Sequence, residues 1–164
     1  MKSLRKRAVA GGAIWATIVV LAGTNAVGSY LESLTLSRFD ELLEARHTQV
    51  VVALANTGGD GGAMNRQLID PVYQQPFSGT YWQASNDDGE VVVSRSLTDT
   101  LLSVSSPGEA NASIELVDGP AFQKLRALSR QTALDDGSVW LVIAASSTKL
   151  LEADQAELRR RLNI

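Results

Sequence analysis

Residues 79–93 read GTYWQASNDDGEVVV, and this stretch decides the fold. Two runs with β-forming side chains, Gly79–Ser85 and Glu90–Leu97, flank the tetrapeptide Asn86-Asp87-Asp88-Gly89. Asn, Asp and Gly accept the positive φ angles that tight hairpin turns require. The stretch therefore predicts a β-hairpin and places an antiparallel sheet at the centre of the molecule.

The sequence after this hairpin extends the same sheet. Residues 123–134 alternate between apolar and polar side chains, and Leu125, Ala127 and Leu128 are expected to face inward. An Asp-Asp-Gly sequence at 135–137 follows and predicts a second hairpin turn. The apolar run 138–146 then predicts a buried strand. The remaining elements expected here are a loop at 105–112, a short strand at 113–117 with a turn at 118–120, and a helix at 147–163.

The N-terminal part of the chain contains one long apolar stretch, Ala8–Val27, directly after the cations Lys2, Arg5, Lys6 and Arg7. About 20 apolar residues in a helix span a hydrocarbon core of roughly 30 Å, and flanking cations stay in the cytoplasm. We therefore expect a cytoplasmic basic tail (1–7), a transmembrane helix (8–28) and an extracytoplasmic domain (29–164) at a bacterial inner membrane.

A cleaved signal peptide is the alternative interpretation of this stretch, with a small-x-small site at Thr24-Asn25-Ala26. Three features favour an anchor: the length of the apolar run, an aromatic side chain at Tyr30 where the interface would lie, and no Gly/Pro break before the next segment. Both interpretations export the rest of the chain.

Residues 28–57 have a helical pattern that continues the apolar stretch. One face carries Leu36, Phe39, Leu43, Val50 and Leu54, with His47 in the gap between them. Together with the apolar stretch this predicts one helix of nearly 50 residues, which ends at the Gly-rich segment 56–62. The predicted fold class is α+β: a long N-terminal helix, an antiparallel sheet of four or five strands, and a C-terminal helix.

Composition excludes some classes of function. The chain has a net charge of −3, and four of its 15 basic residues lie in the first seven positions, so the remainder is distinctly acidic. A nucleic-acid partner would need a basic face and is not expected. There is no cysteine, which excludes disulfides and thiol chemistry, and no Gly-x-Ser-x-Gly or HExxH motif. We expect no catalysis and no metal centre in this chain.

Four blocks of sequence carry a resemblance. They are Asp70–Gln83 (DPVYQQPFSGTYWQ), Ser94–Asp99 (SRSLTD), Arg38–Arg46 (RFDELLEAR) and the closing segment. Taken in their order along the chain, these blocks resemble the extracytoplasmic sensor regions of a group of proteobacterial two-component sensor histidine kinases. Their corresponding blocks are DPRF…P-SG-YWQ and SRSLWD, so Thr98 stands where a tryptophan is usual.

The resemblance implies the architecture of the whole protein. It implies a membrane helix, a periplasmic sensor domain with a PAS-like (PDC-like) sheet, a second membrane helix expected after Ile164, and then a HAMP linker and a kinase. That kinase would use ATP and Mg²⁺, form a homodimer and phosphorylate a cytoplasmic response regulator; membrane lipid and an unknown periplasmic ligand would be the other partners. The chain would be the non-catalytic input part.

His47 is the one histidine of the chain. It is not expected to be a phosphoacceptor, because no H-E-x-x-x-P box surrounds it. A packed histidine on the helix face is the simplest interpretation, and a pH-responsive switch is the functional one, since an unperturbed histidine pKa lies near 6.5.

Tyr81, Trp82, Arg95 and Trp140 are the residues expected to line a sensory pocket, because aromatic and guanidinium groups stack on ligands and bind carboxylates. Packing in the core or on a sheet face is the alternative for each of them. The acidic turns at 87–90 and 135–137 could bind Ca²⁺ or Mg²⁺, but Asp-Gly is also the ordinary chemistry of hairpin turns.

Two other functions fit parts of the pattern. A pilin-like subunit also has an apolar N-terminal helix before a sheet, but it would need a glutamate early in the apolar run, and the first acidic residue is Glu32. A binding protein released by signal cleavage would begin near Val27.

Overall fold

The computed structural model describes residues 2–105 and 112–149, and the chain divides into two compact units, Met1–Phe39 and Asp40–Ile164. The first unit consists of helix. Helix α1 has the bounds Lys2–Thr57, so the predicted continuous helix is confirmed and is 56 residues long. Within this unit the side chains of Trp15, Tyr30 and Leu36 are exposed. Among the residues that the structure describes, no helix is long and apolar enough to cross a membrane.

The second unit begins with the last turns of α1, whose inner face is buried as predicted. Leu43, His47, Val50 and Leu54 are at most 2 % exposed. Their spacing places them on one side of a helix with 3.6 residues per turn. Helix α1 ends at Thr57, and the two residues that follow, Gly58 and Gly59, both have positive φ angles.

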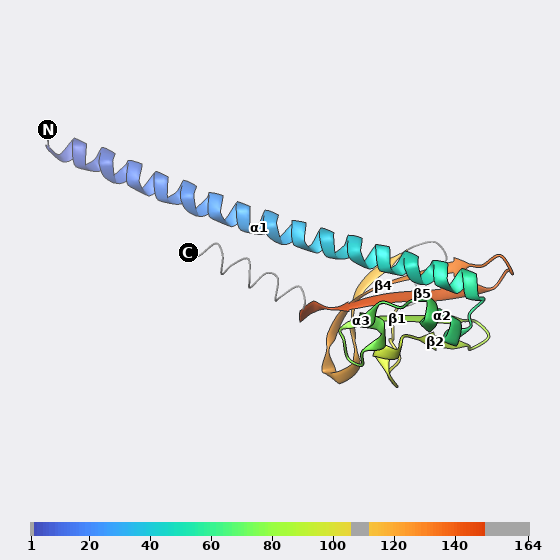
Figure 1. The fold of residues 1–164 in the computed structure, drawn as a ribbon. Coiled ribbons are helices and arrows are strands. Elements are labelled where there is room, and N and C mark those ends of the chain that lie inside the picture. The colour runs from blue at the N-terminus through green and yellow to red at the C-terminus, as the bar shows by residue number, and fades with distance from the viewer. Residues whose placement is uncertain (1, 106–111, 150–164) are drawn as a thin grey trace. The chain divides into compact units, whose positions relative to one another are not determined.

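A five-stranded antiparallel sheet forms the body of the second unit, in the order β2-β1-β5-β4-β3 (Figure 1). The bounds are β1 Thr80–Asn86, β2 Val91–Val93, β3 Ser113–Asp118, β4 Lys124–Ala133 and β5 Val139–Ser147. Both predicted hairpins are confirmed, since β1 pairs with β2 and β4 pairs with β5. The short predicted strand at 113–117 is confirmed as β3, paired with β4.

The helix-side cluster covers one face of this sheet with residues from α1 and the following helices. It contains Val50, Ala53, Leu54, Met64, Leu68, Tyr73, Trp82, Ala84, Trp140 and Val142. The loop-side cluster covers the opposite face and draws on the segment after β2. It contains Tyr81, Leu97, Leu102, Val117, Leu125, Ala127, Ile143 and Ala145. Successive strand residues point to opposite faces, so Tyr81 and Trp82 belong to different clusters.

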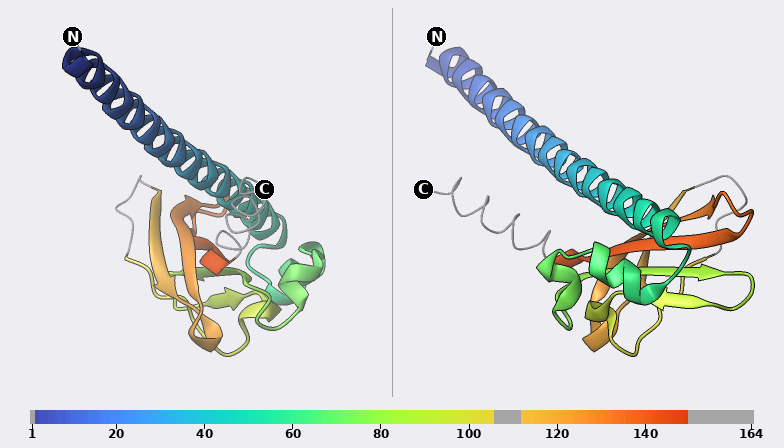
Figure 2. Two further views of the ribbon diagram at one scale, coloured as in Figure 1. Left: turned by 90° about the vertical axis from the view of Figure 1, so that its left-hand side faces the viewer. Right: turned by 45° about the vertical axis from the view of Figure 1, so that its right-hand side comes forward.

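Two short helices were not predicted. Helix α2 (Gly61–Gln67) and helix α3 (Pro71–Gln74) lie beside β1 and β2 (Figure 2). Asp60 and Asp70 cap them by accepting hydrogen bonds from Ala63 N and Val72 N. Pro71 is the first residue of α3, a position at which the fixed φ angle of proline favours a helix.

The second strand of the first hairpin is shorter than predicted. It stops at Val93, and residues Arg95–Leu97 form a short 3-10 helix, η1. Pro120–Phe122 form a second one, η2. The expected loop at 105–112 and the expected helix at 147–163 fall largely on residues outside the described ranges, apart from the end of β5 and the two residues that follow it.

Candidate functional site

The last turns of α1 are attached to the sheet by two ion pairs in register. Arg126 on β4 donates two hydrogen bonds to Asp40, of 2.7 Å from Nε to Oδ1 and 2.9 Å from Nη2 to Oδ2. One helical turn later, Nη2 of Arg130 lies 3.4 Å from Oε1 of Glu44. Residues four apart lie on one face in both a helix and a strand, so the two pairs run parallel along the same contact.

Arg46 attaches the other flank of the helix to the paired strands β1 and β5. Its Nη1 atom donates to the hydroxyl of Thr80 at 3.4 Å and to that of Ser146, the residue opposite Thr80 in the sheet. Both hydroxyl residues are buried. The inner face of α1 therefore has charged or polar contacts on both sides of its apolar centre.

His47 lies between these two sets of contacts. It is 2 % exposed, and its Nε2 atom has no hydrogen-bond partner within the described part of the chain. Burial lowers the pKa of His47 below its usual 6.5 and the Arg130 cation lowers it further, while a hydrogen bond to the backbone of Val142 and the charge of Glu44 act in the opposite direction. The folded protein therefore disfavours the charged form of this imidazole relative to a solvent-exposed histidine.

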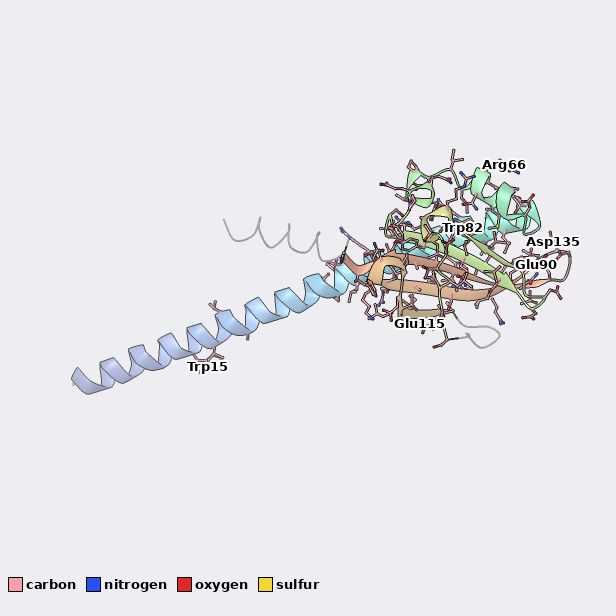
Figure 3. All side chains as sticks on the ribbon, turned by 90° about the horizontal axis from the view of Figure 1, so that it is seen from below. Trp15, Arg66, Trp82, Glu90, Glu115 and Asp135 are labelled. Atoms are coloured by element: carbon pink, nitrogen blue, oxygen red, sulfur yellow. The ribbon has the colours of Figure 1, made fainter. Side chains whose placement is uncertain are left out.

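The four residues predicted to line a pocket do not form one group, because only Trp82 and Trp140 share a cluster. Trp82 is 0 % exposed within the helix-side cluster, and Figure 3 places it inside the domain, whereas Glu90 and Asp135 lie at its surface. Trp140 belongs to the same cluster. Tyr81 lies on the other face, where its hydroxyl accepts from Gly79 N and donates to Gln123 Oε1.

Arg95 lies apart from the three aromatic residues. It is exposed in η1, and its Nη1 atom donates to Gln74 Oε1 at 3.2 Å. The ligand-binding role of these four residues stays a prediction. Their positions indicate that each aromatic ring contributes to packing, and that a ligand would contact them only if the clusters opened.

The described residues of the second unit line surface cavities at two places that bear on a ligand site. The first has a volume of about 430 Å³ between α1 and the α2–α3 connection, and the second has about 710 Å³ beside β3. The first is lined by Thr48, Gln49, Val52, Ala53, Gln67, Leu68, Ile69, Asp70 and Tyr73. Two of its polar groups are already engaged, since Asp70 caps α3 and the Thr48 hydroxyl donates to the Glu44 carbonyl. The second is lined by Thr100, Leu101, Ser103, Val104, Ser105, Glu115, Leu116, Val117, Asp118 and Gly119.

The acidic turns make local hydrogen bonds. Asn86 accepts from Glu90 N and its Nδ2 atom donates to Glu90 Oε2, while Asp136 accepts from the backbone and the hydroxyl of Ser138. The two hydrogen bonds from Ser138 lower the pKa of Asp136. Within the described ranges no group of three or more His, Asp or Glu residues could hold a metal ion.

The residues that attach α1 to the sheet were not predicted as a functional group. A signal for them is present in the sequence, because Asp40 and Glu44 are spaced by four, as are Arg126 and Arg130. The spacing alone cannot show that β4 is the strand beneath α1. Comparisons with protein-family models, with curated proteins and with solved structures find no match for this chain.

Proposed function

We propose that this chain is the sensory input region of a membrane-bound two-component histidine kinase. A periplasmic signal would alter the contact between the end of α1 and the sheet, and α1 would carry the change through the inner membrane to a cytoplasmic kinase. The observation that carries this proposal is the attachment of residues 40–57 to the sheet by ion pairs and a buried face, within a helix that begins at Lys2.

A contact of this kind between α1 and the sheet can respond to small displacements of the helix. Packed helix–sheet interfaces change between discrete arrangements, and signalling helices move by about 1–2 Å or rotate slightly. Asp40 and Arg126 are only partly exposed (30 % and 25 %), so their pairing depends on the close approach of helix and strand. The apolar stretch Ala8–Val27 would be the membrane anchor, and the antiparallel sheet would be PAS-like, as the sequence resemblance implies.

The remaining features of the proposal follow from the same resemblance. The protein would act as a homodimer with periplasmic sensor domains. ATP and Mg²⁺ would bind to the kinase, and a response regulator would receive the phosphoryl group. A membrane-anchored binding domain without kinase output is the alternative.

A chimeric kinase tests the proposal. Residues 1–164 are fused through a second membrane helix to a histidine kinase core, and autophosphorylation is measured in membranes. Asp40→Asn should change the basal rate because it removes an ion pair that attaches α1. The matched control is Glu41→Gln, one residue further along, where the side chain is exposed and makes no ion pair within the described residues. Equal rates for both variants and the parent chimera would contradict the proposal.

A further inference from the structure

The packing around His47 gives the charged form of this ring little support, because only the Val142 backbone and the Glu44 charge favour it in the described part of the chain. The ring is fully covered by the sheet, and its Nε2 atom has no acceptor among the described residues. A protonated imidazole has two N–H donors, so protonation would add a buried donor without a partner. Leaving such a group unpaired in a buried position is strongly unfavourable.

Within the part of the chain that the structure describes, the charged groups around His47 come from two elements. Helix α1 contributes Glu44 and Arg46, and strand β4 contributes Arg130. Strand β5 and the helix-side residues of β1 carry no ionisable side chain, and α3 contributes only Tyr73. Glu44 is already paired with Arg130, so the one carboxylate that the described residues place near His47 is shared between a permanent cation and the imidazole.

We propose that protonation of His47 releases the end of α1 from the sheet, so that the chain responds to periplasmic acid. This inference rests on the proposed function for its biological meaning, because the released helix would be the signal. The structural basis is the position of His47 between Leu43 and Val50, at the centre of the face that attaches α1.

The pH window follows from the position of the ring. Well above pH 6.5 the imidazole is neutral in both the attached and the released states, and pH has no effect through this group. Below this value the released ring binds a proton before the attached ring does, so acid favours release. The ratio of released to attached molecules should rise by up to about tenfold per pH unit until the attached ring also titrates.

The first measurement is an NMR titration of the full chain in detergent micelles. Since the chain contains one histidine, a single imidazole signal reports its midpoint without further assignment. We expect a midpoint below 6.5. Arg130→Gln should raise this midpoint because it removes a like charge, and Glu44→Gln should lower it. A midpoint at or above 6.5 in the parent chain, or shifts of the same sign in both variants, would overturn the proposal.

The second measurement follows release directly. The chain has no cysteine, so Ala45→Cys on α1 and Ala133→Cys on β4, both exposed, accept one spin label each. The distance distribution between the labels should broaden from about pH 8 to about pH 5 and recover on return. His47→Gln should remove this change. If the distribution is insensitive to pH, or if His47→Gln retains the full change, the proposal fails.

These readouts are independent of kinase output. A pH-insensitive contact would leave the chimera experiment and the proposed sensory function intact. A silent chimera would leave the proton-linked contact intact. If His47→Gln does not fold, the opposite shifts expected for Arg130→Gln and Glu44→Gln still decide the question.

Discussion

Two buried tryptophans of the helix-side cluster provide a matched test of how this core is built. Trp82 and Trp140 are 0 % and 2 % exposed. They differ in the indole N–H: Trp140 Nε1 donates to the Ser138 hydroxyl at 3.0 Å, whereas Trp82 Nε1 has no partner within the described part of the chain. The perturbation is Trp→Phe at each position, which removes the N–H and part of the ring.

The two substitutions should lower the free energy of unfolding by different amounts because only Trp140 makes this hydrogen bond. Loss of ring surface and the small cavity cost about 1–2 kcal/mol at either position. At Trp82 the substitution also removes an unpaired buried donor, and this stabilises the protein by about 1–3 kcal/mol. The net change in the free energy of unfolding should therefore be close to zero. At Trp140 the substitution removes a satisfied hydrogen bond, which adds about 1 kcal/mol and brings the cost to roughly 2–3 kcal/mol.

Hydrogen exchange of the β5 amides is the suitable assay, because it measures the free energy of opening the sheet without relying on tryptophan fluorescence or on the helical signal of α1. We expect Trp140→Phe to lower this free energy by about 2 kcal/mol more than Trp82→Phe does. An equal or larger loss for Trp82→Phe would refute the reasoning and would mean that its N–H has a partner in solution.

Three further outcomes follow from single contacts. Asp40→Asn should lower the free energy of unfolding by roughly 1 kcal/mol at low salt and by less at high salt, measured by urea unfolding, and a salt-independent loss would argue against an ion pair. Gly59→Ala should be more destabilising than Gly137→Ala in thermal unfolding: both have φ +85, but a Cβ at Gly59 would lie 2.6 Å from Trp140 Cζ2 and at Gly137 would meet nothing within 4 Å. The free energy of unfolding of the parent chain should decrease as the pH is lowered below about 6.5. His47→Gln should make this free energy less dependent on pH, and an unchanged pH dependence would exclude His47 as its origin.

Much of the fold could be predicted because its signals are local. The Asp-Gly turns at 87–89 and 135–137 lie within the hairpins that they specify, and Gly89 and Gly137 have the positive φ that such turns need. The buried face of α1 from Leu43 to Leu54 follows from a spacing that is visible in the sequence. The short helices α2 and α3 were missed because the Gly-rich segment 56–62 was interpreted only as the end of the long helix, although Asp60 and Asp70 are good N-caps.

The candidate site could be predicted only in part. His47 was identified from its type and position, but its missing partner at Nε2 and its proximity to Arg130 depend on the strand beneath it. Tyr81, Trp82, Trp140 and Arg95 were grouped by chemistry, and the pleat of β1 then placed the first two on opposite faces.

By itself the sequence determined the long helix, the strands of the sheet, where the hairpins turn, and which face of α1 is apolar, because backbone preference and periodicity act over a few residues. Only the tertiary structure decided that β5 lies between β1 and β4, and that α1 is attached through Asp40–Arg126 and Glu44–Arg130. These pairs join residues 86 positions apart. Contacts at that separation depend on the packing of the whole domain, and no local pattern encodes them.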